Sequence, residues 1–154
     1  MNPTIRPATP DDALGIHNLH TRSVRGLCSA DYPQEVIDGW LEGRSPEGYS
    51  GIAKNEMFVC VEDGKILGWS HVRPNMLVAL FVDPDHTRRG IGRMLFGYAL
   101  RIIRNQTSSP IEFEATLTAV PFYERCGCKQ LRTSTIRKNN VDVPTVWMLL
   151  PALE

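Results

Sequence analysis

The sequence has little cysteine and no residue pattern typical of a metal site. Of its four cysteines, Cys28 and Cys60 stand alone, and one residue separates Cys126 from Cys128 where a zinc half-site has two. This arrangement favours reduced, structural cysteines over a disulfide scaffold. We therefore expect no disulfide framework and no metal.

The sequence also lacks an excess of charge and a long apolar run. Lys+Arg and Asp+Glu each total 17, which excludes a global field for nucleic acid or an anionic membrane. The apolar run Met76–Val82 is far shorter than the roughly 20 residues that span a bilayer. The first residues have no basic stretch followed by an apolar one, unlike a secretory signal. We expect a cytoplasmic protein with no nucleic-acid and no membrane partner.

What the sequence does contain is an ordinary globular composition, with 42% hydrophobic and 22% charged residues. Its 154 residues match the usual size of one domain, so we expect a single domain over 1–154. The stretch 39–50 is predicted to be a loop inside that domain, because the roughly 40 residues before it are too few for a separate core.

Apolar periodicity predicts helices and strands along the chain. Strands are expected at 4–6, 57–61, 66–72, 76–82, 111–115, 129–137 and 142–149. Helices are expected at 9–27, 31–41, 91–103 and 119–126. The strand 76–82 is apolar throughout, which predicts burial on both faces. The order predicts an α/β (α+β) fold, with a single mixed, mostly antiparallel sheet flanked by helices.

A glycine-rich turn, Thr87–Arg93, joins the apolar strand 76–82 to the amphipathic helix 91–103. Unpaired backbone N–H groups and the helix dipole make such a turn an anion site. Gly90 and Gly92 allow the backbone to approach a ligand closely, and the neighbouring arginines add charge that suits phosphate.

Two common phosphate loops do not match this turn. A Walker loop ends in Gly-Lys-Ser/Thr, whereas Gly92 is followed by Arg93. A dinucleotide loop starting at Gly90 needs a third glycine at position 95, which is Leu95. The turn therefore predicts phosphate binding of a different kind.

The segment from Val82-Asp83-Pro84 through Arg88-Arg89-Gly90-Ile91-Gly92 resembles the acetyl-CoA motif of GNAT N-acetyltransferases, which reads Q/R-x-x-G-x-G/A after a strand. The segment Ala119–Cys128 is similar to the second family motif, A-x-x-F-Y-x-x-x-G-F. Three positions depart from the family pattern: Thr87 replaces Gln or Arg, Thr116 replaces a frequent Asn, and Cys128 replaces an aromatic residue.

The resemblance implies a GNAT-like acyltransferase fold that uses acetyl-CoA as co-substrate and no metal. In that family the sheet splays between the two strands that correspond to 76–82 and 111–115, and the pantetheine arm enters the gap. The cofactor contacts implied are Phe81, Val82, Arg88, Arg89, Gly90, Ile91, Gly92, Arg93, Thr116 and Phe122. Tyr123 matches the family tyrosine that donates a proton to the departing sulfur.

The sequence does not identify which residue is the general base or which residues form the acceptor pocket. Glu114 and His71 are the candidate bases, with Glu112 as a further alternative on the same strand face as Glu114. Tyr32 and Trp40 are candidate acceptor contacts, because two aromatic rings beside an acid suit an aromatic or cationic amine. The stretch Tyr32–Trp40 also resembles a bacterial branch of small-molecule GNAT enzymes.

The activity that follows is transfer of an acetyl group from acetyl-CoA to a primary amine of a small molecule, by direct attack in a ternary complex. Two alternatives share the fold: a non-catalytic acyl-CoA sensor, and acetylation of a protein or peptide amine.

A nucleic-acid module built on the basic face of helix 91–103 is disfavoured by zero net charge. A homodimer is also expected, through Val143–Leu150 as a paired edge strand.

Overall fold

The computed structural model describes residues 2–153. Its helices are α1 (Ala13–Leu27), α2 (Gln34–Leu41), α3 (Ile91–Gln106) and α4 (Val120–Arg125). Its strands are β1 (Thr4–Pro7), β2 (Met57–Glu62), β3 (Lys65–Arg73), β4 (Met76–Val82), β5 (Ile111–Thr116), β6 (Lys129–Lys138) and β7 (Val141–Leu150). Each predicted element is present within a few residues of its expected ends.

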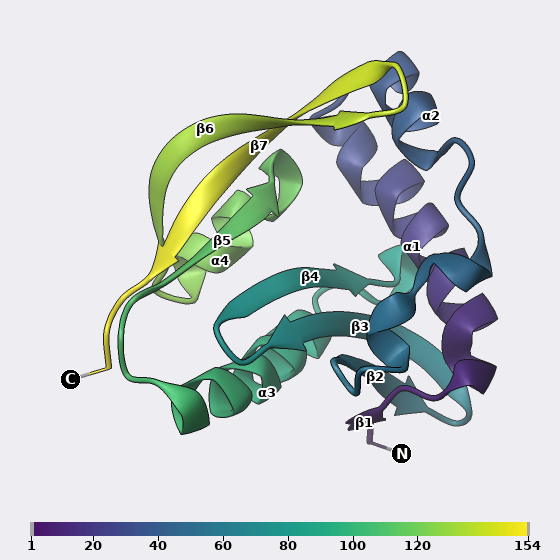
Figure 1. Cartoon of the computed structure of the whole chain (residues 1–154). Coiled ribbons are helices and arrows are strands. Elements are labelled where there is room, and N and C mark those ends of the chain that lie inside the picture. The colour runs from purple at the N-terminus through teal and green to yellow at the C-terminus, as the bar shows by residue number, and fades with distance from the viewer. Residues whose placement is uncertain (1, 154) are drawn as a thin grey trace.

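The strands form two antiparallel sheets, with orders β1-β2-β3-β4 and β5-β7-β6. The predicted α/β fold class is confirmed, and the predicted single sheet is divided in two between the strands where the family resemblance implied a splay. In Figure 1, β4 and β5 diverge, so no ladder of backbone hydrogen bonds joins them. The division leaves an edge of each sheet facing a common gap, where a ligand can approach the backbone.

Three helices cover the sheets. The helix α3 packs on one face of the four-stranded sheet, α1 packs on the other, and α2 lies against β7 (Figure 1). The buried stripe of α3 consists of Ile91, Leu95, Phe96, Ala99 and Ile103. This stripe has the three- and four-residue spacing that the sequence analysis identified, and its burial holds the start of α3 firmly against the sheet.

Two predictions about strand position are wrong. Only Leu77 of β4 is buried and the other residues are half-buried, because β4 is the last strand of its sheet and faces the gap. The strand β7, which contains the proposed dimer edge Val143–Leu150, lies between β5 and β6. Since both of its sides are already hydrogen-bonded, it is not available to a second chain, and a homodimer stays a prediction without that interface.

Candidate active site

The turn after β4 is anchored by a buried carboxylate. Asp83 has no exposed side-chain surface, its Oδ1 accepts from the Asp85 N–H at 3.0 Å, and its Oδ2 accepts from Arg22 of α1 at 2.7 Å. Burial opposes the charged form, but these two donors outweigh it and hold the pKa of Asp83 below its usual range. The pair fixes where the glycine-rich turn begins relative to α1.

The turn itself has the backbone of an anion cradle. Arg88 and Gly90 both have positive φ angles, 64° and 80°. Residues of this conformation aim successive N–H groups into one concavity. Gly90 is the N-cap of α3 and provides no side-chain cap, so the first amides of the helix stay available to a ligand. Gly92 is required for packing, because a Cβ there would lie 3.1 Å from the ring of Phe122.

A cavity of about 570 Å³ opens in front of this cradle. Its walls come from β4, the turn, the first turn of α3 and α4. Nine of the ten predicted cofactor contacts line it: Phe81, Val82, Arg88, Gly90, Ile91, Gly92, Arg93, Thr116 and Phe122. The sequence-predicted contacts are thus brought together in space.

Arg89 is the exception. Its guanidinium points away to Glu62 on β2 and donates to both carboxylate oxygens at 3.0 Å. A guanidinium held by this two-pronged bond has its favoured donors occupied. Arg89 therefore stays a predicted cofactor contact through its backbone amide, which belongs to the turn, while its side chain is bound to Glu62.

Tyr123 lies at the inner end of the same cavity. Its side chain is buried and its ring packs edge-on against Phe113, with 4.8 Å between the ring centroids. Burial raises the pKa of Tyr123, so the hydroxyl stays protonated. A rigidly held, protonated phenol can donate a proton to a neighbouring leaving group.

A small cavity of about 60 Å³ occupies the gap between β4 and β5 and is lined by Tyr123 and Glu114. Beyond it lies a second large cavity, of about 290 Å³, bounded by β3, β6, α1, α2 and the loop before β2. Phe81 and Thr116 border all three spaces. The three cavities therefore form one path, which we call the cleft, with a cofactor side, a central gap and an acceptor side.

Glu114 is placed differently from Glu112. Glu114 is half-buried, lines the gap and the acceptor side, and accepts from the Thr145 hydroxyl at 2.5 Å through Oε2. Glu112 is exposed and pairs with Arg132 at 3.2 Å. Of these two carboxylates, Glu114 is the one that lies beside the gap.

His71 lines the acceptor side of the cleft. Its Nε2 lies 2.8 Å from Oε1 of Glu56, and this hydrogen bond is the largest influence that lowers the pKa of Glu56. The imidazole is oriented by a carboxylate, as a base often is, but it does not border the central gap.

A family model described as an acetyltransferase (GNAT) domain matches residues 28–148. This chain belongs to the GNAT acetyltransferase family. The predicted family and the predicted enzyme class are thereby confirmed. The GNAT domain described here also resembles individual relatives along most of its length.

One relative is the uncharacterized N-acetyltransferase YafP of Escherichia coli, which is 25% identical over 146 residues, covering 95% of this chain and 91% of that one. The crystal structure of a GCN5-related N-acetyltransferase from Rhodopseudomonas palustris matches with a TM-score of 0.84 at 20% identity, over 99% of this chain and 97% of that one. A PaiA N-acetyltransferase from Thermoplasma acidophilum, solved in complex with coenzyme A, matches with a TM-score of 0.73 at 17% identity, over 99% of this chain and 100% of that one.

Of the two predicted acceptor contacts of the GNAT domain, only one lines the acceptor side of the cleft. Trp40 is buried and lines the acceptor side of the cleft. Tyr32 does not line it: its hydroxyl donates to the Pro144 carbonyl at 2.5 Å and accepts from the Leu117 N–H at 2.9 Å. Because those bonds tie the loop before α2 to β7 and to the end of β5, they give Tyr32 a structural role, and its role as a substrate contact stays a prediction that these cavity walls do not support.

Several residues of the acceptor side were not found by sequence reasoning. They are His20, Arg44, Tyr49, Trp69 and Lys138, which come from α1, β3, β6 and the loop between α2 and β2. The sequence analysis predicted only a loop for the stretch 39–50, and it gave Lys138, at the end of a strand, no role in a site. No short motif joins these positions; clustering of aromatic residues was the one available signal.

Among residues 2–153, no helix is both long and apolar enough to cross a bilayer. Within the same residues, no group of three or more His, Cys, Asp or Glu side chains is arranged to hold a metal ion.

Proposed function

We propose that this GNAT family member transfers the acetyl group of acetyl-CoA to the amine of a small molecule, by direct attack in a ternary complex. The observation that carries the proposal is the continuous cleft, with an anion cradle at one end and Tyr123 and Glu114 in its central gap. A two-ended cleft suits two substrates that meet in the middle, which direct transfer requires.

The cofactor side fits acetyl-CoA in shape and charge. The positive-φ turn presents free amides, and Arg88 and Arg93 border the cavity with cationic side chains. These groups suit the pyrophosphate. The remaining walls, from β4 and α4, are largely apolar, which suits the pantetheine arm. The complex of the PaiA relative with coenzyme A supports the same assignment.

The residues in the gap have distinct proposed roles. When bound, acetyl-CoA supplies a thioester whose carbon–sulfur bond breaks as the acceptor nitrogen forms its bond to the acetyl carbon. Tyr123 donates its hydroxyl proton to the departing sulfur, and Glu114 takes a proton from the acceptor amine. β4 is an edge strand, so the backbone groups near Val82 that face the gap are free to orient and polarise the acetyl carbonyl.

Glu114 is the preferred base because it borders both the gap and the acceptor side. His71 is the alternative, at greater depth in the acceptor side. The half-buried Thr116 keeps its proposed place beside the cofactor, although its hydroxyl already accepts from the Ala119 N–H at 3.2 Å and caps the turn before α4. That bond gives the Thr116 departure from the family pattern a structural explanation.

The experiment that tests this function measures binding and turnover separately. Thermal unfolding with increasing acetyl-CoA measures affinity, and release of the CoA thiol with a panel of small amines measures transfer. We expect a clear rise of the unfolding midpoint and amine-dependent thiol release. Saturable binding without thiol release by any small amine would favour a sensor, and release only with peptide amines would favour a protein substrate.

Three further expectations stay predictions. They are a single domain over residues 1–154, a cytoplasmic location, and the absence of a metal from the reaction.

A further inference from the structure

Two cationic side chains border the acceptor side of the cleft without a partner acid. Arg44 and Lys138 both line this cavity. Neither takes part in an ion pair with any residue of the 2–153 range. Burial and the charge of Arg44 lower the pKa of Lys138, while Glu114 acts in the opposite direction. The two cations are therefore close enough to repel each other, and a bound anion would relieve that repulsion.

Arg44 is held in place by neutral groups. Its Nη2 donates to His20 Nδ1 at 2.6 Å and lies 3.4 Å from the Tyr49 hydroxyl. A ring nitrogen that accepts from a guanidinium carries no proton of its own, so His20 adds no charge. Burial, and then the charge of Arg44, lower the pKa of His20 to about 2, which agrees with that geometry. His20 thus orients the guanidinium and leaves its positive charge unneutralised.

Two buried donors beside this cavity have no acceptor. Nε of Arg44 and Nε1 of Trp69 are both buried and without a hydrogen-bond partner within the described chain. Each of these groups is donor-only. Buried donors are almost always paired in folded proteins, so these two unpaired donors add to the polar character of a wall that offers no acceptor to either of them, although neither nitrogen has surface open to the cavity.

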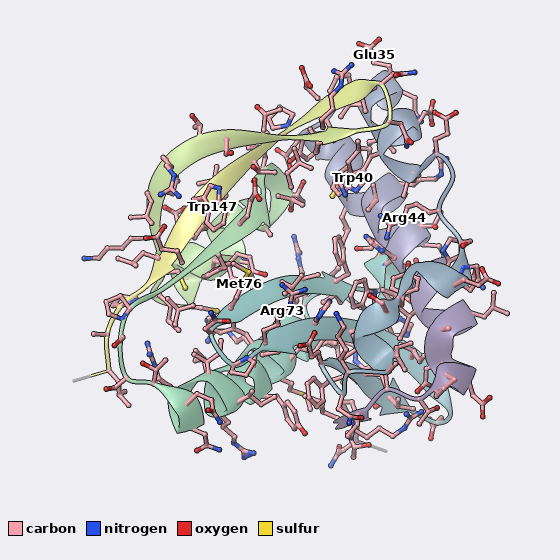
Figure 2. The ribbon with its side chains drawn as sticks, in the orientation of Figure 1. Glu35, Trp40, Arg44, Arg73, Met76 and Trp147 are labelled. Atoms are coloured by element: carbon pink, nitrogen blue, oxygen red, sulfur yellow. The ribbon has the colours of Figure 1, made fainter. Side chains whose placement is uncertain are left out.

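Part of the cavity wall is aromatic. The rings of Trp69 and Phe81 are stacked with centroids 5.3 Å apart, and Tyr49 stands edge-on to Trp69 at 5.7 Å. Figure 2 shows Trp40 and Arg44 on the side where α1 and α2 face the opening between the sheets, and both line the same cavity. A flat apolar body fits such walls, with its polar ends directed at the charged groups.

We propose that the acceptor is an amine that also carries a carboxylate, bound by Arg44 and Lys138 while its nitrogen points to Glu114 at the gap. This inference rests on the proposed function and names the substrate class of that same site. The cavity thus holds two cationic side chains and the carboxylate of Glu114, which together match a substrate that carries both a carboxylate and an amine. A guanidinium suits a carboxylate because it donates two parallel hydrogen bonds.

The test compares acids with their uncharged amides. The probes are 4-(aminomethyl)benzoate and 4-(aminomethyl)benzamide, and as a second pair L-phenylalanine and L-phenylalaninamide. Calorimetry measures their dissociation constants on the CoA-saturated protein and on the free protein. We expect the acid of at least one pair to bind about tenfold or more tightly than its amide, as a charge-assisted hydrogen bond predicts.

Variants test whether Arg44 and Lys138 cause the preference for the acid over its amide. Arg44→Gln and Lys138→Gln should each reduce the ratio of amide to acid dissociation constants, and Arg44→Lys should retain part of it. Arg137→Gln is the matched control, because Arg137 is the neighbour of Lys138 on β6 but pairs with Asp142 at 2.8 Å outside the cavity. Thermal unfolding midpoints establish that each variant is folded.

Equal binding of acid and amide in both pairs, or no binding by any probe, would overturn the carboxylate subsite. A preference that survives both Arg44→Gln and Lys138→Gln would overturn it too. Failure of CoA to bind would instead overturn the proposed function, and it is measured independently of the acid-to-amide ratio on the free protein.

Discussion

The two ends of the cleft are built in different ways. The anion cradle of the cofactor side is one short stretch, residues 82–93, in which a strand end, a positive-φ turn and a helix start follow one another, while α1, α4 and the end of β5 complete the cavity walls. The acceptor side is assembled from α1, α2, β3, β5, β6 and a loop. A local motif keeps its geometry through its own backbone, whereas a dispersed cavity keeps its shape only through packing of distant elements. The comparison teaches that binding the common co-substrate and choosing the acceptor are separable tasks in this fold.

The largest effect is expected from Gly90→Val, on the cofactor side. A β-branched residue at φ 80° is strained, and its side chain would occupy the space in front of the cradle. We expect acetyl-CoA affinity to fall by about 100-fold or more, measured by calorimetry. Gly64→Val is the matched control, because Gly64 also has a positive φ, 77°, with open space around it, but lies in the β2–β3 hairpin. If both variants bind acetyl-CoA normally, the cradle assignment is wrong.

The next effect in size concerns the central gap. Tyr123→Phe removes the proposed proton donor and keeps the ring that packs against Phe113. We expect kcat to fall about 100-fold, with acetyl-CoA affinity nearly unchanged. Tyr98→Phe, on the far side of α3 against Phe58, is the control and should leave kcat unaltered. Unchanged turnover in Tyr123→Phe, with chemistry rate-limiting, would exclude the hydroxyl from the reaction.

A smaller effect distinguishes two neighbouring arginines. Arg88→Gln removes a cation that borders the cofactor cavity, so acetyl-CoA affinity should fall about tenfold. Arg89→Gln removes a guanidinium that is bound to Glu62, so affinity should change less than about twofold. Titration calorimetry at fixed ionic strength measures both. The reverse order of effects would contradict the side-chain directions described above.

The last prediction concerns stability and not binding or turnover: a pH dependence from the acceptor side. His20 is neutral when folded, with a pKa of about 2, but titrates near 6.5 when unfolded. Between these values the unfolded chain binds the extra proton, so stability is fully present above pH 6.5 and is lost as the pH falls. The free energy of unfolding should decrease by up to about 1.4 kcal/mol per pH unit below 6.5. His20→Gln should remove this slope in urea unfolding at pH 7, 6 and 5; an unchanged slope would exclude His20 as its source.

Prediction from the sequence succeeded where the physical cause is local. The predicted strands 57–61 and 66–72 are joined by a tight hairpin turn at Asp63-Gly64, with φ angles of 52° and 77°, because few other conformations suit a two-residue connection. The helix at Ile91 follows from its apolar spacing and from Gly90 before it. The sequence did not indicate the hydrogen-bond partners of Tyr32 and Arg89, since those partners lie on strands distant in the chain.

The sequence alone determined the order of helices and strands, the glycine turn with its N–H groups and the family of the fold, because each depends on contacts among residues within a few positions of one another. Only the tertiary structure decided that Tyr123 and Glu114 border the same gap, and that Arg44 and Lys138 line one cavity. The physical reason is that side-chain direction and burial at these positions are set by packing between elements far apart in the chain, which no local pattern of residues encodes.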